Sequence, residues 1–241
     1  MITIALVCLM MSPISISAQD KDMTMNDNWT TYDHAPASGG KPKSMVIMLH
    51  GLGSNGQDLI SLAPYLAQSL PDTIFVSPDA PFPCDMAPFG YQWFSLQDRT
   101  PSVMLSGVQR AAPLLDSYIT TMMEKYDVPA NKVALLGFSQ GTMISLFVGP
   151  RFPETLAGVL GYSGALIGSN SLNGSDINKI PVHLIHGDAD DVVPVDRFFD
   201  AEKALKDNNF AVSGGVTKGL THSIDEKGVA DGTAFLRSIL Y

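Results

Sequence analysis

The chain has 241 residues, of which 15 are Lys or Arg and 24 are Asp or Glu, for a formal net charge of −9. This balance argues against nucleic acids and anionic membrane surfaces as electrostatic partners. The 45% of hydrophobic and 16% of charged residues fit a globular protein, and the length suffices for one large α/β core without a second domain. The two cysteines, Cys8 and Cys84, imply no disulfide framework.

The first 24 residues stand apart from the rest of the chain. Ile2 to Met11 is an apolar run too short to span a bilayer, and Ser17-Ala18-Gln19 could be the cleavage site of a secretory signal. However, no Lys or Arg precedes the apolar run, and Met23 and Met25 offer alternative starts. Residues 1–24 are therefore either a signal peptide, which would make the protein periplasmic or secreted, or a misassigned start of a cytoplasmic protein. Residues 25–241 are expected to form a single domain.

Apolar runs and helical periodicity alternate along this domain. Strands are predicted over residues 45–50, 73–77, 133–138, 156–162, 182–186 and 210–216. Helices are predicted over 57–69, interrupted at Pro64, over 102–126, kinked at Pro113, and over 140–148, 196–207 and 224–240. This alternation indicates an α/β protein with a mostly parallel sheet covered by helices on both faces. Functional groups at the ends of successive strands then fall on one edge of the sheet.

The segment 132–141 (KVALLGFSQG) carries the strongest functional signal. Its apolar run leads directly into the pattern G-x-S-x-G, and a helical pattern follows. This is the context of a nucleophile elbow, a sharp strand-to-helix turn that exposes one serine. Gly137 and Gly141 flank Ser139 because the strained turn leaves no room for side chains there. The pattern therefore predicts Ser139 as a nucleophile, with the N–H groups of a helix N-terminus close by.

A serine nucleophile needs a histidine base and an acid that orients the histidine. In proteins with this elbow the chain order is serine, acid, histidine. Of the five histidines, only His183, His186 and His222 follow Ser139. His183 and His186 lie in or at the end of an apolar strand, before any suitable acid loop, and their alternation along a strand also argues against a metal pair. His222, in the loop GLTHS, is therefore the predicted base.

The acid is expected in the loop 186–194 (HGDADDVVP), directly after a predicted strand. Three aspartates compete there. The spacing H-G-x-x-D-x-x-V-P favours Asp190, with Asp191 and Asp188 as alternatives. The loop taken alone could also be a solvated turn in which Asp191 or Asp196 caps the next helix.

Acyl transfer also needs backbone N–H donors aimed at the developing oxyanion. One is expected from Gln140, the residue after the nucleophile, and the other from Leu52, in the glycine loop after the first predicted strand.

The same glycine loop allows an alternative function. Residues 51–56 read G-x-G-x-x-G, and Asp79 lies 23 residues beyond Gly56, near the spacing of a ribose-binding acid. A dinucleotide-binding protein is therefore a rival hypothesis. It leaves Ser139, Asp190 and His222 unexplained, whereas acyl transfer uses the same glycines as an oxyanion loop.

Four segments together resemble the carboxylesterase and acyl-protein thioesterase family of α/β-hydrolases, also called the phospholipase/carboxylesterase family. They are LHGLG (49–53), GFSQG (137–141), HGDADDVVP (186–194) and GLTHSID (219–225). The resemblance covers residues 45–241 and implies an α/β-hydrolase fold for a catalytic domain over residues 25–241. The family usually continues GFSQG with another glycine, where this chain has Thr142, and we expect a packing effect there without loss of chemistry.

The resemblance implies Ser139 as nucleophile, Asp190 as acid and His222 as base. It also implies Leu52 and Gln140 as oxyanion donors.

Two loops bear on the substrate. Only about 19 residues separate Tyr162 from Val182, too few for a cap domain, so an open site is expected. The segment 80–101 is long and rich in aromatic residues, and loops of this length are often functional. The resemblance places Gln92, Trp93 and Phe94 of this segment near the acyl pocket, although such aromatic residues could equally pack on the core.

The function implied is that of a serine hydrolase that cleaves carboxylic esters or acyl thioesters through an acyl-enzyme, with no cofactor and no metal. A lysophospholipase is an alternative, and a catalytically inactive hydrolase-fold binding module is a more remote one. The expected partner is a small-molecule or acylated substrate, without nucleic acid or stable membrane insertion. A homodimer is left open.

Overall fold

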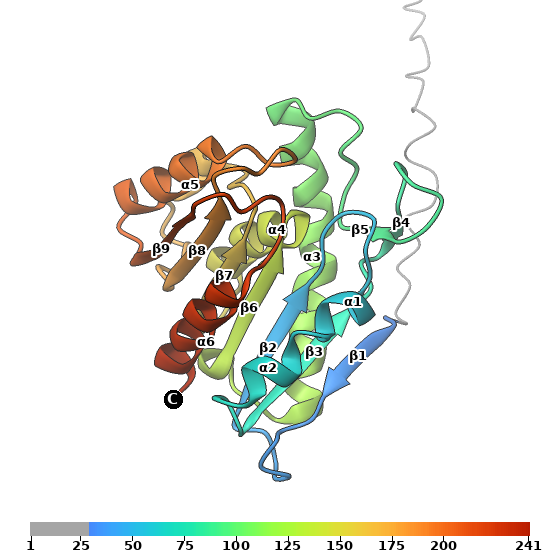
Figure 1. Ribbon diagram of the computed structural model, residues 1–241, viewed down its shortest axis with the longest axis vertical. Coiled ribbons are helices and arrows are strands. Elements are labelled where there is room, and N and C mark those ends of the chain that lie inside the picture. The colour runs from blue at the N-terminus through green and yellow to red at the C-terminus, as the bar shows by residue number, and fades with distance from the viewer. Residues whose placement is uncertain (1–28) are drawn as a thin grey trace, which may run out of the picture.

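The computed structural model of the protein describes residues 29–241, so both interpretations of residues 1–24 concern a segment outside the described part. The described chain forms a seven-stranded sheet with helices on both faces, and a separate two-stranded sheet (Figure 1). The strands are β1 (Thr31–His34), β2 (Ser44–Leu49), β3 (Thr73–Pro78), β4 (Phe82–Pro83), β5 (Tyr91–Gln92), β6 (Val133–Phe138), β7 (Gly158–Tyr162), β8 (Val182–Gly187) and β9 (Val212–Thr217). The helices are α1 (Gly56–Ile60), α2 (Ala63–Ala67), α3 (Pro101–Tyr126), α4 (Gln140–Val148), α5 (Asp196–Asp207) and α6 (Glu226–Leu240), with short 3-10 helices η2 (Ala130–Lys132), η3 (Gly149–Arg151) and η4 (Ser169–Ser171).

The strand order β1-β3-β2-β6-β7-β8-β9 confirms the predicted α/β-hydrolase sheet. β1 pairs with β3 in antiparallel fashion, and all other neighbours in this sheet are parallel. The carboxyl ends of β2, β6, β7, β8 and β9 therefore lie on one edge, where the loops that follow them meet. Between β7 and β8 the chain contains only the short helix η4.

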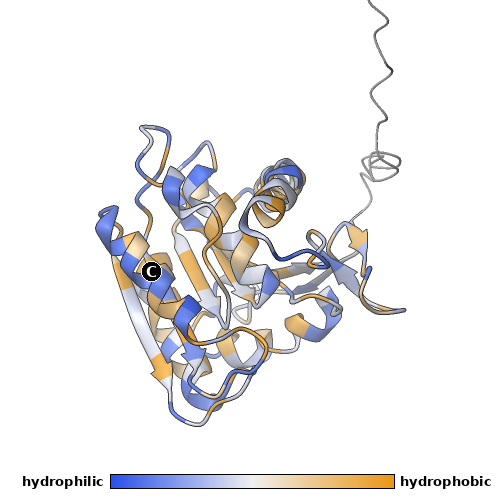
Figure 2. Cartoon of the chain, turned by 90° about the horizontal axis from the view of Figure 1, so that it is seen from above, coloured by the Kyte–Doolittle hydropathy of each residue, from blue (hydrophilic) through white to orange (hydrophobic). Residues whose placement is uncertain are grey.

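The sheet separates two hydrophobic cores because successive side chains of a strand point to opposite faces. On β2, Met45, Ile47 and Leu49 pack into the core covered by α3, α4 and α5, whereas Val46 and Met48 pack into the core covered by α1, α2 and α6. All five side chains are fully buried. Figure 2 shows the two helical layers on either side of the sheet, with hydrophilic residues gathered on the outer surfaces of the helices.

Several predicted elements have the bounds expected from the sequence, namely β6, α4 and α5. The helix predicted over 57–69 is divided into α1 and α2, because Pro64 lies in the first turn of α2, where its missing N–H is tolerated. α3 continues through Pro113 as one helix of 26 residues and ends at Asp127, whose φ is 52°. Among the described residues, no helix is both long and apolar enough to cross a membrane.

A short hairpin within the aromatic segment was not predicted. β4 and β5 pair in antiparallel fashion, and the hairpin is attached to the glycine loop by hydrogen bonds from Gly53 N to Tyr91 O and from Tyr91 N to Ser54 O, both 2.9 Å. Gly90 makes this approach possible, since its φ is +75° and a Cβ there would lie 2.0 Å from Gly53 O. The hairpin thereby supports the loop that follows β2.

Candidate active site

Ser139 occupies the turn between β6 and α4. Its backbone has φ 54° and ψ −116°, a strained conformation for a residue with a side chain. The flanking glycines allow the turn, because a Cβ on Gly141 would lie 1.7 Å from Leu49 O and one on Gly137 would lie 2.4 Å from Thr142 N. Ser139 N donates to Tyr162 O at 2.9 Å. The sequence pattern G-x-S-x-G thus corresponds to a strained turn held against β2 and β7.

Asp190 and His222 meet at the same edge of the sheet. His222 Nδ1 donates to Asp190 Oδ2 at 2.7 Å, while Asp190 Oδ1 accepts hydrogen bonds from Val192 N at 3.0 Å and Val193 N at 2.8 Å. The Asp190 side chain is fully buried and that of His222 is 16% exposed. The His222 ring also packs on Phe138, with 4.9 Å between the ring centroids. With Nδ1 directed at Asp190, the other ring nitrogen is left for the reaction.

The hydrogen bonds decide the charge of Asp190. Burial raises its pKa, but the hydrogen bonds from His222, Val193 and Val192 and the charge of His222 outweigh burial, so that its pKa lies below the ordinary value. Asp190 is therefore a carboxylate that accepts the hydrogen bond from His222 Nδ1.

The two competing aspartates lie elsewhere. Asp188 Oδ1 accepts a hydrogen bond from Gly219 N at 2.5 Å, and so ties the acid loop to the loop that carries His222. Asp191 is exposed to solvent. Of the three aspartates, the structure brings Asp190 to His222.

Ser139 and His222 line one cavity of about 710 Å³ together with Gly51 and Leu52. The hydrogen bonds among the described residues do not include one between Ser139 Oγ and His222 Nε2, a contact that often tightens only when substrate binds. Neither Leu52 N nor Gln140 N donates to another backbone group in the described chain. Gln140 N is one of the free N–H groups at the start of α4, as the predicted oxyanion donors require.

His50, which the sequence analysis did not single out, holds the glycine loop that was predicted to supply an oxyanion donor. Ala80 N donates to His50 Nε2 at 2.9 Å, and His50 Nδ1 lies 2.7 Å from Gly51 O. Because Nε2 accepts, the proton must be on Nδ1, which then donates to Gly51 O. Burial lowers the pKa of His50 and keeps this neutral form. Its position directly before Gly51 was the only sequence signal for the role.

The three residues predicted to bind substrate lie in the core behind the cavity. Gln92, Trp93 and Phe94 are at most 5% exposed, and none of them lines the cavity. The side chain of Gln140 binds their backbone, since its Oε1 accepts from Trp93 N at 2.9 Å and its Nε2 donates to Phe94 O at 2.6 Å. Trp93 Nε1 donates to His50 O at 2.9 Å. These residues therefore support the loops around Ser139. The apolar residues that line the cavity were not predicted and include Leu96, Met104, Leu105, Met143 and Ile167.

Packing within the fold accounts for the G-x-G-x-x-G pattern. Gly56 N donates to Asp79 Oδ1 at 2.8 Å, so the aspartate expected at a ribose is bound to the loop itself. A Cβ on Gly56 would lie 2.3 Å from Ser77 O. The structure therefore gives Gly56 and Asp79 a role in holding α1 against β3.

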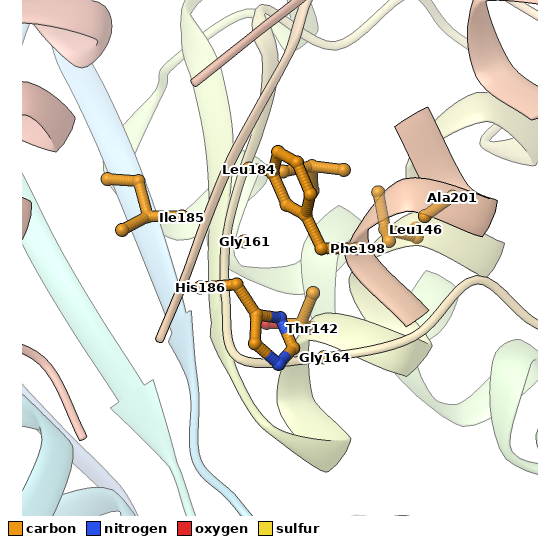
Figure 3. A pocket seen from close by; sticks show the side chains of 9 residues that line it. All are labelled: Thr142, Leu146, Gly161, Gly164, Leu184, Ile185, His186, Phe198 and Ala201. Atoms are coloured by element: carbon orange, nitrogen blue, oxygen red, sulfur yellow. The ribbon is translucent and has the colours of Figure 1, made fainter. Parts of the chain in front are cut away.

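A second histidine contacts the acid. His186 Nε2 lies 2.8 Å from Val193 O and 3.3 Å from Asp190 Oδ2. The side chains of His186 and Asp190 are almost fully buried. Figure 3 shows His186 beside Thr142 and Gly164 at a small internal cavity of about 10 Å³, which is too small for a substrate. His186 thus contacts the loop 186–194 both at Val193 O and at the Asp190 oxygen that accepts from His222.

Thr142 packs behind the nucleophile turn. Its Oγ1 donates to Tyr162 O at 2.8 Å, the carbonyl that also accepts from Ser139 N. A Cβ on Gly164 would lie 2.3 Å from Thr142 Cβ, so the threonine occupies space that a neighbouring glycine leaves free.

His183 is separated from these residues. It stacks on Phe235 and forms a hydrogen bond of 2.8 Å with Ser213 Oγ. In the part of the chain that the structure describes, no group of three or more His, Cys, Asp or Glu side chains is arranged to hold a metal ion.

Comparisons with known proteins show which proteins this chain resembles. A family model described as phospholipase/carboxylesterase matches residues 34–240. Esterase YpfH of Escherichia coli is 29% identical over 81% of this chain and 84% of its own length. Acyl-protein thioesterase 1 of Debaryomyces hansenii is 30% identical over 85% of this chain and 95% of its own. The crystal structure of esterase PE8 aligns with a TM-score of 0.83 at 38% identity, over 88% of this chain and 99% of that one.

Proposed function

Since this chain belongs to the phospholipase/carboxylesterase family of α/β-hydrolases, we propose that it hydrolyses carboxylic esters or acyl thioesters with Ser139 as nucleophile, His222 as base and Asp190 as orienting acid. The protein is a serine hydrolase of the carboxylesterase and acyl-protein thioesterase type. The observation that carries the assignment of residues is the 2.7 Å contact between Asp190 and His222, at a cavity that Ser139 also lines.

In the proposed reaction, Asp190 holds the proton of His222 on Nδ1 and leaves Nε2 as the base. Nε2 takes the proton of Ser139 as Oγ attacks the acyl carbonyl, and the N–H groups of Leu52 and Gln140 stabilise the oxyanion. The imidazolium gives its proton to the leaving alcohol or thiol, and an acyl-enzyme remains. A water molecule that loses a proton to His222 then attacks this acyl group, which releases the acid and regenerates Ser139.

The cavity supports an acylated substrate. Its volume of about 710 Å³ and its mainly apolar lining suit an acyl chain as well as a small ester. A lysophospholipid would require the enzyme to act on a lipid surface, and the net charge of −9 disfavours an anionic one. We therefore propose acyl esters or thioesters in solution as substrates.

We also propose a cytoplasmic location, with translation that starts near Met23. The alternative is export with a signal peptide that is cleaved from residues 1–24. N-terminal sequencing of the mature protein distinguishes the two.

A fluorophosphonate probe tests the nucleophile. Ser139→Ala should abolish labelling and lower the turnover of p-nitrophenyl esters by about 10³-fold or more, with an unchanged melting temperature. Ser163→Ala is the matched control, because Ser163 lies on the next strand end in a similar positive-φ turn but does not line the cavity. It should keep both labelling and activity. Substantial turnover by Ser139→Ala would overturn the mechanism.

A further inference from the structure

The charged residues that line the cavity are positive, whereas the chain as a whole has a negative net charge. Of the residues that line it, Arg99 and Arg197 carry a permanent charge, and no Asp or Glu belongs to this lining. The protein as a whole has 24 acidic against 15 basic side chains. A cavity with two cations and no carboxylate is therefore a local exception to an acidic surface.

Neither arginine is engaged in a strong interaction within the fold. Arg99 is exposed, and its guanidinium takes part in no hydrogen bond or ion pair among residues 29–241. Arg197 Nη1 lies 3.4 Å from Asp200 Oδ2, and both side chains are at least 60% exposed, so this pair holds the guanidinium only weakly. Both cations are thus available to a ligand in the cavity.

The acidic residues nearest in sequence are directed elsewhere or lie outside the cavity. Asp98 Oδ1 accepts a hydrogen bond from Thr100 N at 2.8 Å. Asp191 and Asp196 are exposed and do not belong to the lining. They weaken the positive potential around Arg99 and Arg197, but they cannot take the place of a ligand inside the cavity.

The two arginines come from separate elements that meet at the catalytic edge of the sheet. Arg99 lies two residues before the start of α3, and Arg197 lies in the first turn of α5, shortly after the acid loop. Figure 1 shows the starts of both helices at the same end of the molecule, above the carboxyl ends of the strands. The lining also includes the apolar Met104, Leu105 and Val193, and the two arginines are the permanently charged groups that it offers to a substrate.

We propose that the preferred substrates of this enzyme carry a carboxylate or phosphate away from the scissile carbonyl, and that Arg99 and Arg197 bind this anion. The planar guanidinium matches both groups and binds them with two parallel hydrogen bonds. The proposal rests on the proposed function, because it takes Ser139 as the reacting group. It narrows the substrate class from acyl esters in general to anionic esters and thioesters.

Two pairs of substrates test the proposal. Mono-p-nitrophenyl suberate and p-nitrophenyl octanoate have acyl chains of equal length and differ in a terminal carboxylate. S-acetyl-4′-phosphopantetheine and S-acetylpantetheine differ in one phosphate on the leaving group. The first pair reports an anion on the acyl side, and the second reports an anion on the leaving group. Selectivity is the ratio of kcat/KM for the anionic substrate to that for its neutral counterpart.

In Arg99→Gln and Arg197→Gln, selectivity for at least one pair should fall about 5-fold or more, because the anionic substrate loses more kcat/KM than its neutral counterpart. High salt should weaken the selectivity of the wild type in the same direction. Arg110→Gln is the control, since Arg110 is an exposed arginine of α3 that binds Ser106 and lies outside the lining. Unchanged selectivity in both variants for both pairs, or an equal fall in Arg110→Gln, would overturn the proposal. Activity retained by Ser139→Ala would instead contradict the proposed function.

Discussion

Replacement of Asp190 by asparagine isolates the charge of the acid from its size. Oδ1 of an asparagine can still accept the N–H groups of Val192 and Val193, so the loop keeps its hydrogen bonds. In the wild type, Oδ2 accepts from His222 at 2.7 Å and lies 3.3 Å from His186 Nε2. In the variant, an amide nitrogen takes the place of this oxygen. Two donors then face each other unless His222 moves its proton to Nε2. That tautomer cannot take the proton of Ser139.

The expected loss follows from the number and kind of contacts. A hydrogen bond to a charged group is worth about 1.5–3 kcal/mol, and the wrong histidine tautomer costs a well-studied serine protease about 10⁴ in kcat. We expect kcat of Asp190→Asn to fall by about 10³- to 10⁴-fold, while KM changes by less than about 3-fold, because the acid does not touch the substrate.

Steady-state hydrolysis of p-nitrophenyl octanoate measures both constants. Asp191→Asn is the matched control, since Asp191 is exposed on the same loop, and it should keep wild-type kcat. Asp188→Asn should cost less than Asp190→Asn, because an amide oxygen can still accept from Gly219 N. A kcat above about one tenth of wild type in Asp190→Asn, or an equal loss in Asp191→Asn, would refute the assignment of the acid.

The same variant tests the pKa of Asp190. Because this pKa is lowered on folding, the carboxylate stabilises the fold fully above its unfolded value of about 3.8, and this contribution is lost as pH falls through the lower folded value. The stability difference between wild type and Asp190→Asn should therefore change between pH 5 and pH 2 in favour of the variant. A constant difference over that range would show that the charge does not contribute.

Two further predictions concern the histidines. His222→Ala should abolish the turnover of p-nitrophenyl esters, because His222 both contacts Asp190 and lines the cavity with Ser139; substantial turnover by this variant would point to another base. His186→Leu should lower kcat by about 10-fold with little change in KM, because it removes the donor to Val193 O and the contact with Asp190, whereas His183→Ala should keep wild-type kcat. An unchanged kcat in His186→Leu would mean that the acid loop is held without this histidine.

The sequence determined the parts of this protein that depend on local chemistry. The bounds of β6 follow from a continuous apolar run that ends at the elbow, and those of α4 and α5 follow from the helical patterns over a few turns. The two glycines around Ser139 are required by backbone contacts within and next to the turn, so they mark the elbow wherever it occurs. The order of serine, acid and histidine likewise follows from the order of strands along one sheet.

Only the tertiary structure decided what depends on residues far apart in the chain. Asp190 differs from Asp188 and Asp191 in its contact with His222, which lies 32 residues further along. The partner of β1 in the sheet, β3, is also distant in the chain. β1 and β5 have only four and two residues, which carry too little periodicity to predict such strands. The aromatic run at Trp93 has the composition of a pocket and of a core alike, and burial against His50 decided between them. Arg99 lies in a loop that no periodicity orients, so its place at the cavity required the packing of α3 against the rest of the fold.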